Sequence, residues 1–487
     1  MSSPDTASAH SSVRSEENAT AIPIESEIYI DPVVEKRLLR KLDFRLISFA
    51  FFSYFTSNLV RNNMQNAYTN GMDVDVGIDS EAYNWCVTFF FIGYIIPQIP
   101  TNMFVARLLP KYFLPTAEII WGVITCCIAV VKTPNAVWGL RFIMGMAQAT
   151  FVPSMVFIIG SWYTNSELAT RTAIFMAGNQ MSGAIGGIIA AGVNNNLNGA
   201  AGKASWQWLF IIEGLMSIFV GLVGYYLLPN YPHNTNWVQG EEKDCAIARL
   251  ERQGKQLKSQ KYTWDTFLNV LATPYAYLLT LDFICINIGN QIPLNFSIIM
   301  KKMGYDANLA NYLVSPIYGL GAITIVIIGW ISDKYGERAW IIIIVQIWVA
   351  VWYLVLFAVN HAATPFWLLM LSSFAIINNI SMFPLVFSFI NEIFALDANT
   401  RALAIACINC IGNLVPNFIS IGIWKVTDAP EFFLGKVVTF ALSVASVIIT
   451  FVCWWCLKHN VNLPRVRDKK EQPEFPEMDD DVDEKKA

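Results

Sequence analysis

Residues 47–68 read ISFAFFSYFTSNLVRNNMQNAY, an apolar run that ends in a cluster of polar side chains. On a helix, where successive residues turn by about 100°, four of its side chains fall within roughly 60° of one another: Tyr54, Asn58, Arg61 and Gln65. An arginine in a membrane-spanning helix is costly unless it faces a cavity, a partner or an anionic ligand. We therefore predict that this helix lines a cavity and that the other helices surround it.

The composition of the whole chain is typical of a membrane protein. Of its 487 residues, 55% are hydrophobic and only 14% are charged, whereas charged residues make up about 25% of a typical soluble domain. The four histidines lie outside the deep parts of the apolar runs. We therefore do not expect this protein to catalyse a histidine-dependent reaction within the membrane. The C-x-x-C pairs at 407–410 and 453–456 lie inside apolar runs, where buried side chains are a simpler interpretation than a metal or redox site.

The chain also lacks a basic stripe of useful length, which argues against nucleic-acid binding. We accordingly expect no enzymatic activity, no metal and no cofactor. The partners that remain are the lipid bilayer and a small solute.

Twelve apolar runs, each long enough to span a bilayer at about 20 residues, follow a polar N-terminal tail. They lie near 43–66, 84–106, 113–131, 136–160, 171–193, 206–228, 275–298, 311–332, 339–358, 365–388, 402–424 and 436–457. We predict an all-α polytopic membrane protein with 12 transmembrane helices in two six-helix halves. The predicted domains are a disordered tail (1–42), an N-terminal half (43–228), a central loop (229–274), a C-terminal half (275–457) and an acidic tail (458–487).

Positive charge is distributed unevenly between the loops. Lysine and arginine concentrate before the first run, in the central loop and in the short loops on the same side, whereas the loop at 66–84 is acidic and has no lysine or arginine. Because loops rich in lysine and arginine stay in the cytoplasm, we predict that both termini and the central loop are cytoplasmic.

A short pattern recurs at the same place in each half. GWISDKYGER (329–338) closes the eighth run, and the weaker counterpart NMFVARLLPK (102–111) closes the second. A carboxylate and cations on such a turn can cap helix ends and form salt bridges that break when the two halves rock. We predict gating roles for four of these residues: Arg107, Asp333, Lys334 and Arg338.

These residues resemble those of the major facilitator superfamily, whose loop pattern GxxxD(R/K)xG(R/K)(R/K) is nearly matched at 329–338, with Glu337 in place of one cation. Within it, the chain resembles the fungal anion:cation symporter family, the allantoate, pantothenate and biotin permease group, over most of residues 43–425. The segments that carry this likeness include RNNMQNA (61–67), PTN (100–102), SWY (161–163), WQWLFIIEG (206–214) and PNYP (229–232). Val60 and Gln148 stand where that family has carboxylates.

The resemblance implies a monomeric fungal transporter of the plasma membrane that imports a small organic anion with protons by alternating access. The proton gradient would supply the energy. The implied substrates are vitamin carboxylates such as pantothenate or biotin, or a related carboxylate, ureide or sulfonate, bound near the bilayer midplane. Two alternatives remain open: a nutrient sensor that does not transport, and a drug or anion exporter of the same superfamily.

The residues predicted to bind the substrate are polar side chains of the spans around this midplane site: Tyr54, Asn58, Arg61, Arg141, Gln148, Asn179, Asn287, Asn290, Asn409 and Asn413. Arg61 is the leading anion contact, because a guanidinium pairs bidentately with carboxylate, phosphate or sulfonate. The alternative is an arginine that reaches to the membrane surface.

Asp282 is the candidate for proton coupling, because a carboxyl group inside a span can take up and release a proton. The helical stripe that contains Asn287 and Asn290 is centred about 150° away from it. If that stripe lines the cavity, a structural role for Asp282 is favoured.

Overall fold

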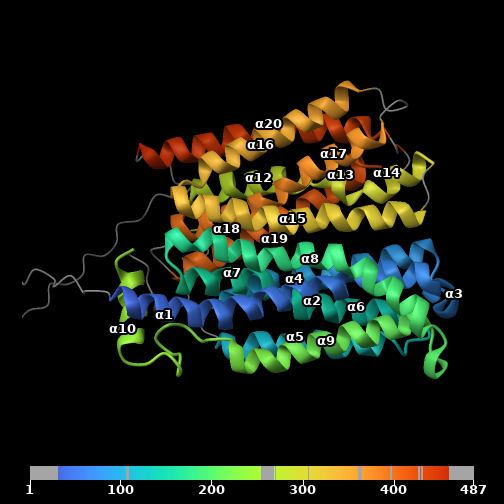
Figure 1. Cartoon of the computed structure of the whole chain (residues 1–487), viewed down its shortest axis with the longest axis horizontal. Coiled ribbons are helices and arrows are strands. Elements are labelled where there is room, and N and C mark those ends of the chain that lie inside the picture. Colours follow the sequence, from blue (N-terminus) through green and yellow to red (C-terminus); the bar gives the residue numbers. More distant parts are fainter. Residues whose placement is uncertain are drawn as a thin grey trace, which may run out of the picture.

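The computed structural model of the protein describes residues 31–105, 109–253, 268, 270–304, 307–359, 365–394, 398–425, 428 and 431–459. Within these ranges the chain is helical and contains no strand. Most of the helices run along the long axis of one bundle (Figure 1). The fold class predicted from the sequence, an all-α polytopic arrangement, is confirmed.

The helices of the first half are α1 (Pro32–Leu42), α2 (Ser48–Ala67), α3 (Asp73–Val76), α4 (Ser80–Val105), α5 (Pro110–Ile128), α6 (Pro134–Gln148), α7 (Phe151–Trp162), α8 (Asn165–Leu197) and α9 (Ser205–Leu227). Two π-helical segments, Asp43–Ile47 and Tyr68–Met72, flank α2, and a 3-10 turn, Ala200–Gly202, precedes α9. The central segment carries α10 (Glu241–Glu251).

The helices of the second half are α12 (Pro274–Ile288), α13 (Gln291–Leu294), α14 (Phe296–Lys302), α15 (Ala307–Tyr335), α16 (Ala339–Ala358), α17 (Phe366–Ile376), α18 (Met382–Ile393), α19 (Ala398–Ile423) and α20 (Phe433–Lys458). A 3-10 segment, Ile377–Ser381, joins α17 to α18.

Local sequence explains where several of these helices begin. Pro110, Pro134 and Pro274 occupy the first position of α5, α6 and α12, where the fixed φ of proline suits the helix and its missing N–H group is not needed. At the start of α8, Thr164 and Glu167 form a reciprocal capping box. Such a cap satisfies two backbone N–H groups that have no partner within the helix.

Each of the twelve predicted spans coincides with helix in the structure. Among the described residues, nine helical segments are long and apolar enough to cross a bilayer by length and composition. Three predicted spans lie outside these nine: α2, α4 and the broken run α12–α14. In α2 the polar stripe that includes Asn58 and Arg61 lowers the hydropathy.

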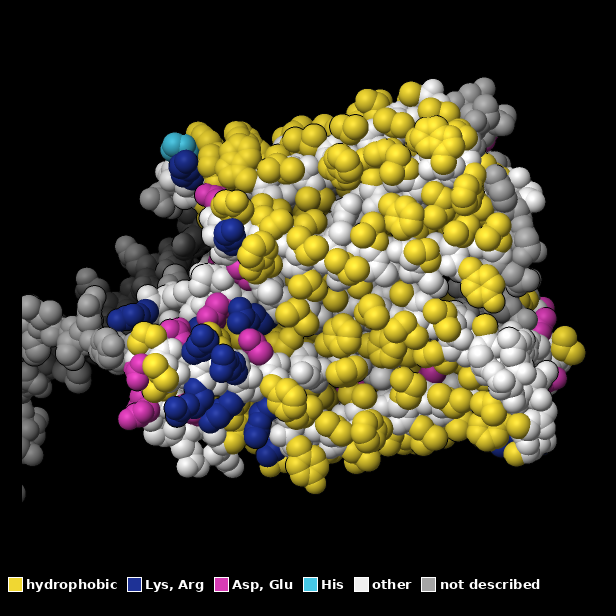
Figure 2. Space-filling view, viewed as in Figure 1, with side chains coloured by type: hydrophobic (Ala, Val, Ile, Leu, Met, Phe, Trp, Pro, Cys, Tyr) yellow, Lys and Arg dark blue, Asp and Glu magenta, His cyan; other side chains and the backbone are white. Residues whose placement is uncertain are grey.

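The surface divides into an apolar flank and a charged end (Figure 2). Apolar side chains cover the long face of the bundle, whereas charged side chains gather at the end that carries α1 and α10. We call this the charged end, and the opposite end, which carries α3 and α14, the α3 end. A broad apolar flank is what contact with lipid tails requires.

Helices from different halves pack against one another mainly as α8 with α15 and α4 with α19. The first pair approaches closely at Gly329, the first residue of the GWISDKYGER segment. A Cβ atom at this position would lie 2.7 Å from Cβ of Ala173 and 3.0 Å from the backbone oxygen of Ala169. Glycine is therefore required here because α15 lies against the backbone of α8.

Candidate functional site

A cavity of about 360 Å³ lies between the two halves. Helices α2, α4 and α8 contribute one wall, and α12, α15, α18 and α19 contribute most of the other. Its size falls in the range of small-molecule sites, about 300–1,000 Å³. Within the described part of the chain it is the leading candidate for a binding site.

Eight of the ten predicted substrate-binding residues line this cavity: Tyr54, Asn58, Arg61, Asn179, Asn287, Asn290, Asn409 and Asn413. The other two lie directly behind Arg61. Gln148 accepts a hydrogen bond at its Oε1 from Nη2 of Arg61 at 3.5 Å, and Arg141 donates from Nη1 to the backbone oxygen of Arg61 at 3.3 Å. The structure thus brings all ten into one region, while their roles in binding stay predictions.

Arg61 is held by neutral groups rather than by a carboxylate. Its guanidinium lies over the rings of Phe90, at 5.3 Å, and Tyr94, at 5.1 Å. Its polar contact is the amide of Gln148. No ion pair to Arg61 occurs among the described residues. The cavity wall therefore carries a cation whose charge is not neutralised there by a direct partner.

A second arginine adds to the positive charge behind this wall. Arg141 is 2% exposed and interacts electrostatically with Glu213, a buried carboxyl group of α9. The cluster thus contains the guanidinium groups of Arg61 and Arg141 and one carboxyl group. The two guanidinium groups carry more positive charge than one carboxylate can neutralise.

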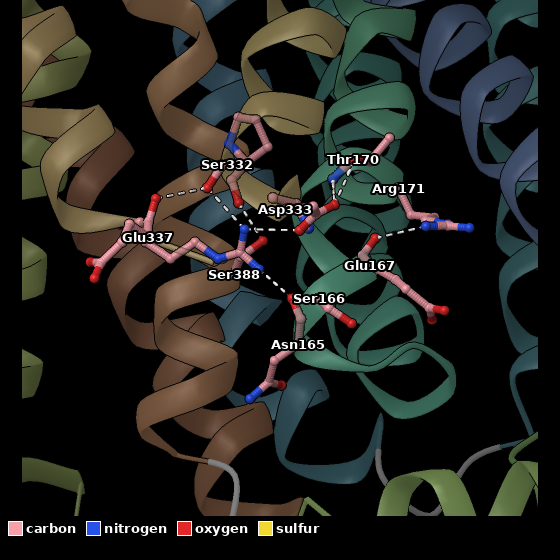
Figure 3. Close-up of polar contacts among 12 residues, drawn as sticks. Asn165, Ser166, Glu167, Thr170, Arg171, Ser332, Asp333, Glu337 and Ser388 are labelled. Carbon is pink, nitrogen blue, oxygen red and sulfur yellow. Dashed lines mark hydrogen bonds and ion pairs between the residues drawn. The ribbon is translucent and has the colours of Figure 1, made fainter. Parts of the chain in front are cut away.

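At the charged end, the turn between α15 and α16 is joined to the first two turns of α8 (Figure 3). The Asp333 carboxylate accepts the backbone N–H groups of Ala169, at 3.1 Å, and Thr170, at 2.7 Å, and also the Thr170 hydroxyl. Arg338 donates to the backbone oxygen of Asn165. These contacts connect the two halves.

Arg338 is also neutralised within its own half. It forms ion pairs with Asp333, at 2.8 Å, and with Glu392, at 3.1 Å, and its side chain is only 4% exposed. Lys334 is exposed, and its Nζ lies 5.1 Å from the ring centroid of Trp330 in its own half. Arg107, the fourth predicted gating residue, lies outside the described residues.

The cavity opens toward the α3 end. Three exposed residues of its lining lie in segments that lead to that end: Asn62, Leu294 and Asn417. At the charged end the halves are in contact through Asp333 and Arg338. The geometry is thus that of a central site reached from one end and closed at the other.

Comparison with known proteins agrees with this arrangement. Residues 50–420 match the family model of the Major Facilitator Superfamily, which covers well over half of the chain. The protein belongs to the major facilitator superfamily. This transporter family moves small solutes across membranes, and the chain is accordingly a multi-pass membrane protein.

Named relatives of this superfamily member are also described as transporters. It is 28% identical to the MFS-type transporter cnsO of Penicillium expansum, over 88% of this chain and 85% of the relative. It is 31% identical to an uncharacterized transporter of Schizosaccharomyces pombe, over 66% of this chain and 63% of the relative. Among solved structures, the proton:xylose symporter XylE bound to 6-bromo-6-deoxy-D-glucose has a TM-score of 0.62 and 15% identity, covering 85% of this chain and 95% of that one. That likeness supports the fold alone.

Asp282 does not line the cavity of this superfamily member. It is 2% exposed and faces α20, where Ser446 and Thr450 donate hydroxyl hydrogen bonds to its two carboxyl oxygens. Asn287 and Asn290, from the opposite face of the same segment, do line the cavity. This is the condition under which a structural role for Asp282 is favoured, and its part in proton coupling stays a prediction.

A similar carboxyl group lies in the other half. Glu118 of α5 is fully buried and accepts hydrogen bonds from Ser53, at 2.6 Å, and Thr56, at 3.0 Å, on α2. Both carboxyl groups therefore brace a helix that lines the cavity, from the side turned away from it.

Several lining residues were not among the predicted substrate contacts. Tyr94 and Gln98 of α4 and Tyr318 of α15 all line the cavity. Tyr94 and Gln98 are four residues apart and share one face of α4. A polar pair at this spacing inside an apolar run is a signal that could have identified them.

Proposed function

We propose that this protein is a proton-coupled symporter that imports a small organic anion across the plasma membrane by alternating access. The observation that carries this proposal is Arg61, a cation on the wall of the central cavity without an ion-pair partner among the described residues. Guanidinium groups bind carboxylate, phosphate and sulfonate through paired charge-assisted hydrogen bonds. A solute that carries such a group would supply the missing charge.

The finer assignment is to the fungal anion:cation symporter family, acting as a monomer with both termini in the cytoplasm. It is supported by the RNNMQNA and WQWLFIIEG segments (61–67 and 206–214) and by the basic character of the charged end. The proposed substrates are vitamin carboxylates such as pantothenate or biotin, or a related carboxylate, ureide or sulfonate. In this orientation the cavity of the structure would open to the outside.

Uptake measurements test the anion site. Radiolabelled pantothenate, biotin, nicotinate, allantoate, cysteine and sulfonates are supplied to cells that express the protein, and the transported compound is then tested with variants. Arg61→Ala is expected to reduce uptake by about 100-fold or more, because a bidentate charged contact is lost. Surface expression is expected to remain normal, since Arg61 has no buried ion pair to break.

Arg61→Lys is the matched control, because lysine keeps the positive charge but lacks the planar guanidinium group. It is expected to retain partial uptake. Wild-type uptake of the true substrate by Arg61→Ala would contradict the anion site. Efflux of the compound rather than uptake would favour the exporter, and binding without movement would favour the sensor.

Proton coupling has a separate test. Uptake by the unmodified protein should be stimulated by external acid and abolished by an uncoupler. If Asp282 carries the coupling proton, Asp282→Asn loses the acid stimulation. Glu118→Gln is the matched control, because Glu118 has two hydroxyl partners in a comparable buried setting. If Asp282→Asn keeps both properties, the coupling proton is carried elsewhere and Asp282 is a structural brace.

A further inference from the structure

Three asparagine side chains form a hydrogen-bonded chain along the second wall of the cavity. Asn287 on α12 donates from Nδ2 to Oδ1 of Asn413 at 3.0 Å, and Asn413 donates from Nδ2 to Oδ1 of Asn409 at 3.0 Å. Each donor in the chain is thus used by the next residue. At the end of the chain, Nδ2 of Asn409 has no hydrogen-bond partner among the described residues.

Backbone carbonyl groups fix the direction of this chain. Nδ2 of Asn287 also donates to the backbone oxygen of Gly412 at 3.2 Å, and Nδ2 of Asn413 to the backbone oxygen of Asn409 at 2.7 Å. Carbonyl oxygens only accept hydrogen bonds, so nitrogen must face them. If the Asn409 amide were turned over, its NH₂ group would face the NH₂ group of Asn413, and no hydrogen bond could form between them. The group left unpaired is therefore a donor.

Asn409 differs in this respect from Asn58 and Asn417, two other asparagines of the lining. Asn58 donates to the backbone oxygen of Tyr54 at 2.8 Å, and Asn417 to that of Asn413 at 2.7 Å. Asn409 is only 3% exposed and its side chain lines the cavity. A buried donor without a partner costs the free energy of its lost hydration. The cavity is the place from which an acceptor can reach it.

The unpaired donor lies deeper in the bundle than Arg61. Asp43 and Arg401 both hydrogen-bond to the last residues of the α7 segment, at the charged end. At a helical rise of about 1.5 Å per residue, Arg61 lies about 27 Å along its helix from Asp43, and Asn409 about 12 Å along α19 from Arg401. Side chains lean toward the helix N-terminus, and the longer arginine reduces the separation of the two polar groups to about 10 Å.

One small anionic group cannot reach both residues across such a distance. We propose that the ligand is elongated and has two recognition groups: an anion that pairs with Arg61 and, about 10 Å away, a hydrogen-bond acceptor that receives Nδ2 of Asn409. This inference rests on the proposed anion site. It names Asn409 as a residue that determines specificity, and it excludes simple monocarboxylates as preferred substrates.

The two groups would also lie in different halves, since α2 belongs to the first and α19 to the second. A ligand held at both ends connects the halves, whereas an anion held at Arg61 alone binds one of them. Binding energy from the second group is therefore available to draw the halves together. Asn287 and Asn413 are positioning residues that act through Asn409.

Binding of matched compounds to the purified full-length protein in lipid nanodiscs tests the inference. The probes are linear methyl-ketone carboxylates from 4-oxopentanoate to 11-oxododecanoate, each compared with the saturated carboxylate of the same chain length. The ketone adds an acceptor and no donor. We expect the ketone of best length to bind about fivefold more tightly than its saturated partner, with an optimum where the two groups are about 10 Å apart.

Substitutions on α19 test whether Asn409 is the source of the preference for the ketone over the saturated acid. Asn409→Leu removes the donor at similar volume and is expected to equalise the affinities of ketone and saturated acid. Asn417→Leu is the matched control on the same helix, and it should keep the preference because its donor is already used. Asn413→Leu leaves the Asn409 amide free to turn and should weaken the preference.

The outcomes separate this inference from the proposed function. A ketone preference that survives in Asn409→Leu, or equal affinities at every length in the unmodified protein, would overturn the inference and leave the anion site intact. Unchanged affinity for the saturated acids in Arg61→Ala would instead overturn the anion site on which the inference rests.

Discussion

Arg338 lies at the closed charged end and Arg61 on the wall of the central cavity, and they differ in how their charge is neutralised. Arg338 forms ion pairs with Asp333 at 2.8 Å and Glu392 at 3.1 Å. The polar side-chain partner of Arg61 is the amide of Gln148. One cation has its counter-charge built into the protein, and the other lines a cavity of ligand size.

This difference assigns the two arginines to different tasks. A buried charge with carboxylate partners stabilises one arrangement of the helices, and removing it leaves those partners unpaired. Aromatic rings stabilise a cation weakly by comparison, so Arg61 can gain a strong contact only from outside. Both regions thus contain an arginine: at the closed charged end it is paired with carboxylates, and at the open cavity it is not.

The largest effect should follow from removing the neutralised cation. Arg338→Ala removes the cation that pairs with Asp333 and Glu392 and breaks the contact to Asn165. We expect the free energy of unfolding to fall by about 3 kcal/mol, measured as a lower thermal midpoint in nanodiscs. The halves should also separate at the charged end, so that thiol reagents added on that side modify Cys410 of the cavity lining faster.

Lys334→Ala is the matched control, because Lys334 is an exposed cation on the same turn. It should change neither quantity measurably, and Cys410→Ser identifies the reporting thiol. Equal effects of the two substitutions would show that the ion pairs of Arg338 do not hold the charged end closed.

A carboxylate at position 148 would give Arg61 the kind of partner that Arg338 already has. Gln148→Glu places a carboxylate where the amide now contacts Nη2 of Arg61. The new carboxylate competes with the ligand anion for the guanidinium, so the affinity for the transported anion should fall by about tenfold. Gln148→Met is the control that removes the amide without adding charge, and a smaller loss is expected. An unchanged affinity in Gln148→Glu would mean that the ligand anion binds away from Arg61.

The fold could be predicted from the sequence because apolar runs of span length leave little freedom in a bilayer. Helix satisfies every backbone hydrogen bond within the span, and each predicted run is helical in the structure. The polar stripe on α2 also indicated which helix faces the cavity. Breaks were harder to foresee: the run from 275 to 298 contains α12, α13 and the start of α14, since Asn290 and Asn295 depart from helical geometry.

The candidate site was predicted less completely, because a stripe on one helix does not say what packs behind it. Asp282 and Asn287 both lie on α12, and the sequence alone could not decide which faced the cavity. The Asp282 carboxyl group accepts hydrogen bonds from the hydroxyls of Ser446 and Thr450, which lie more than 160 positions further along the sequence. Gln148 was expected on the cavity wall, yet it lies behind Arg61, because Arg61 occupies the space in front of it.

The smallest effect should come from an ion pair that is as short as those of Arg338 but more exposed. Lys41 and Glu242 join α1 to α10 at 2.6 Å, but the lysine side chain is 45% exposed. Exposed pairs contribute less than about 1 kcal/mol, because water screens the attraction and ordering a long side chain opposes it. Lys41→Ala should therefore shift the thermal midpoint very little. Arg249→Ala is the buried comparison, since Arg249 is 3% exposed and pairs with Glu35 and Glu167 at 2.6 Å. A loss of stability in Lys41→Ala as large as in Arg249→Ala would show that burial does not set the strength of these contacts, and would remove the reason to expect a large loss from Arg338→Ala.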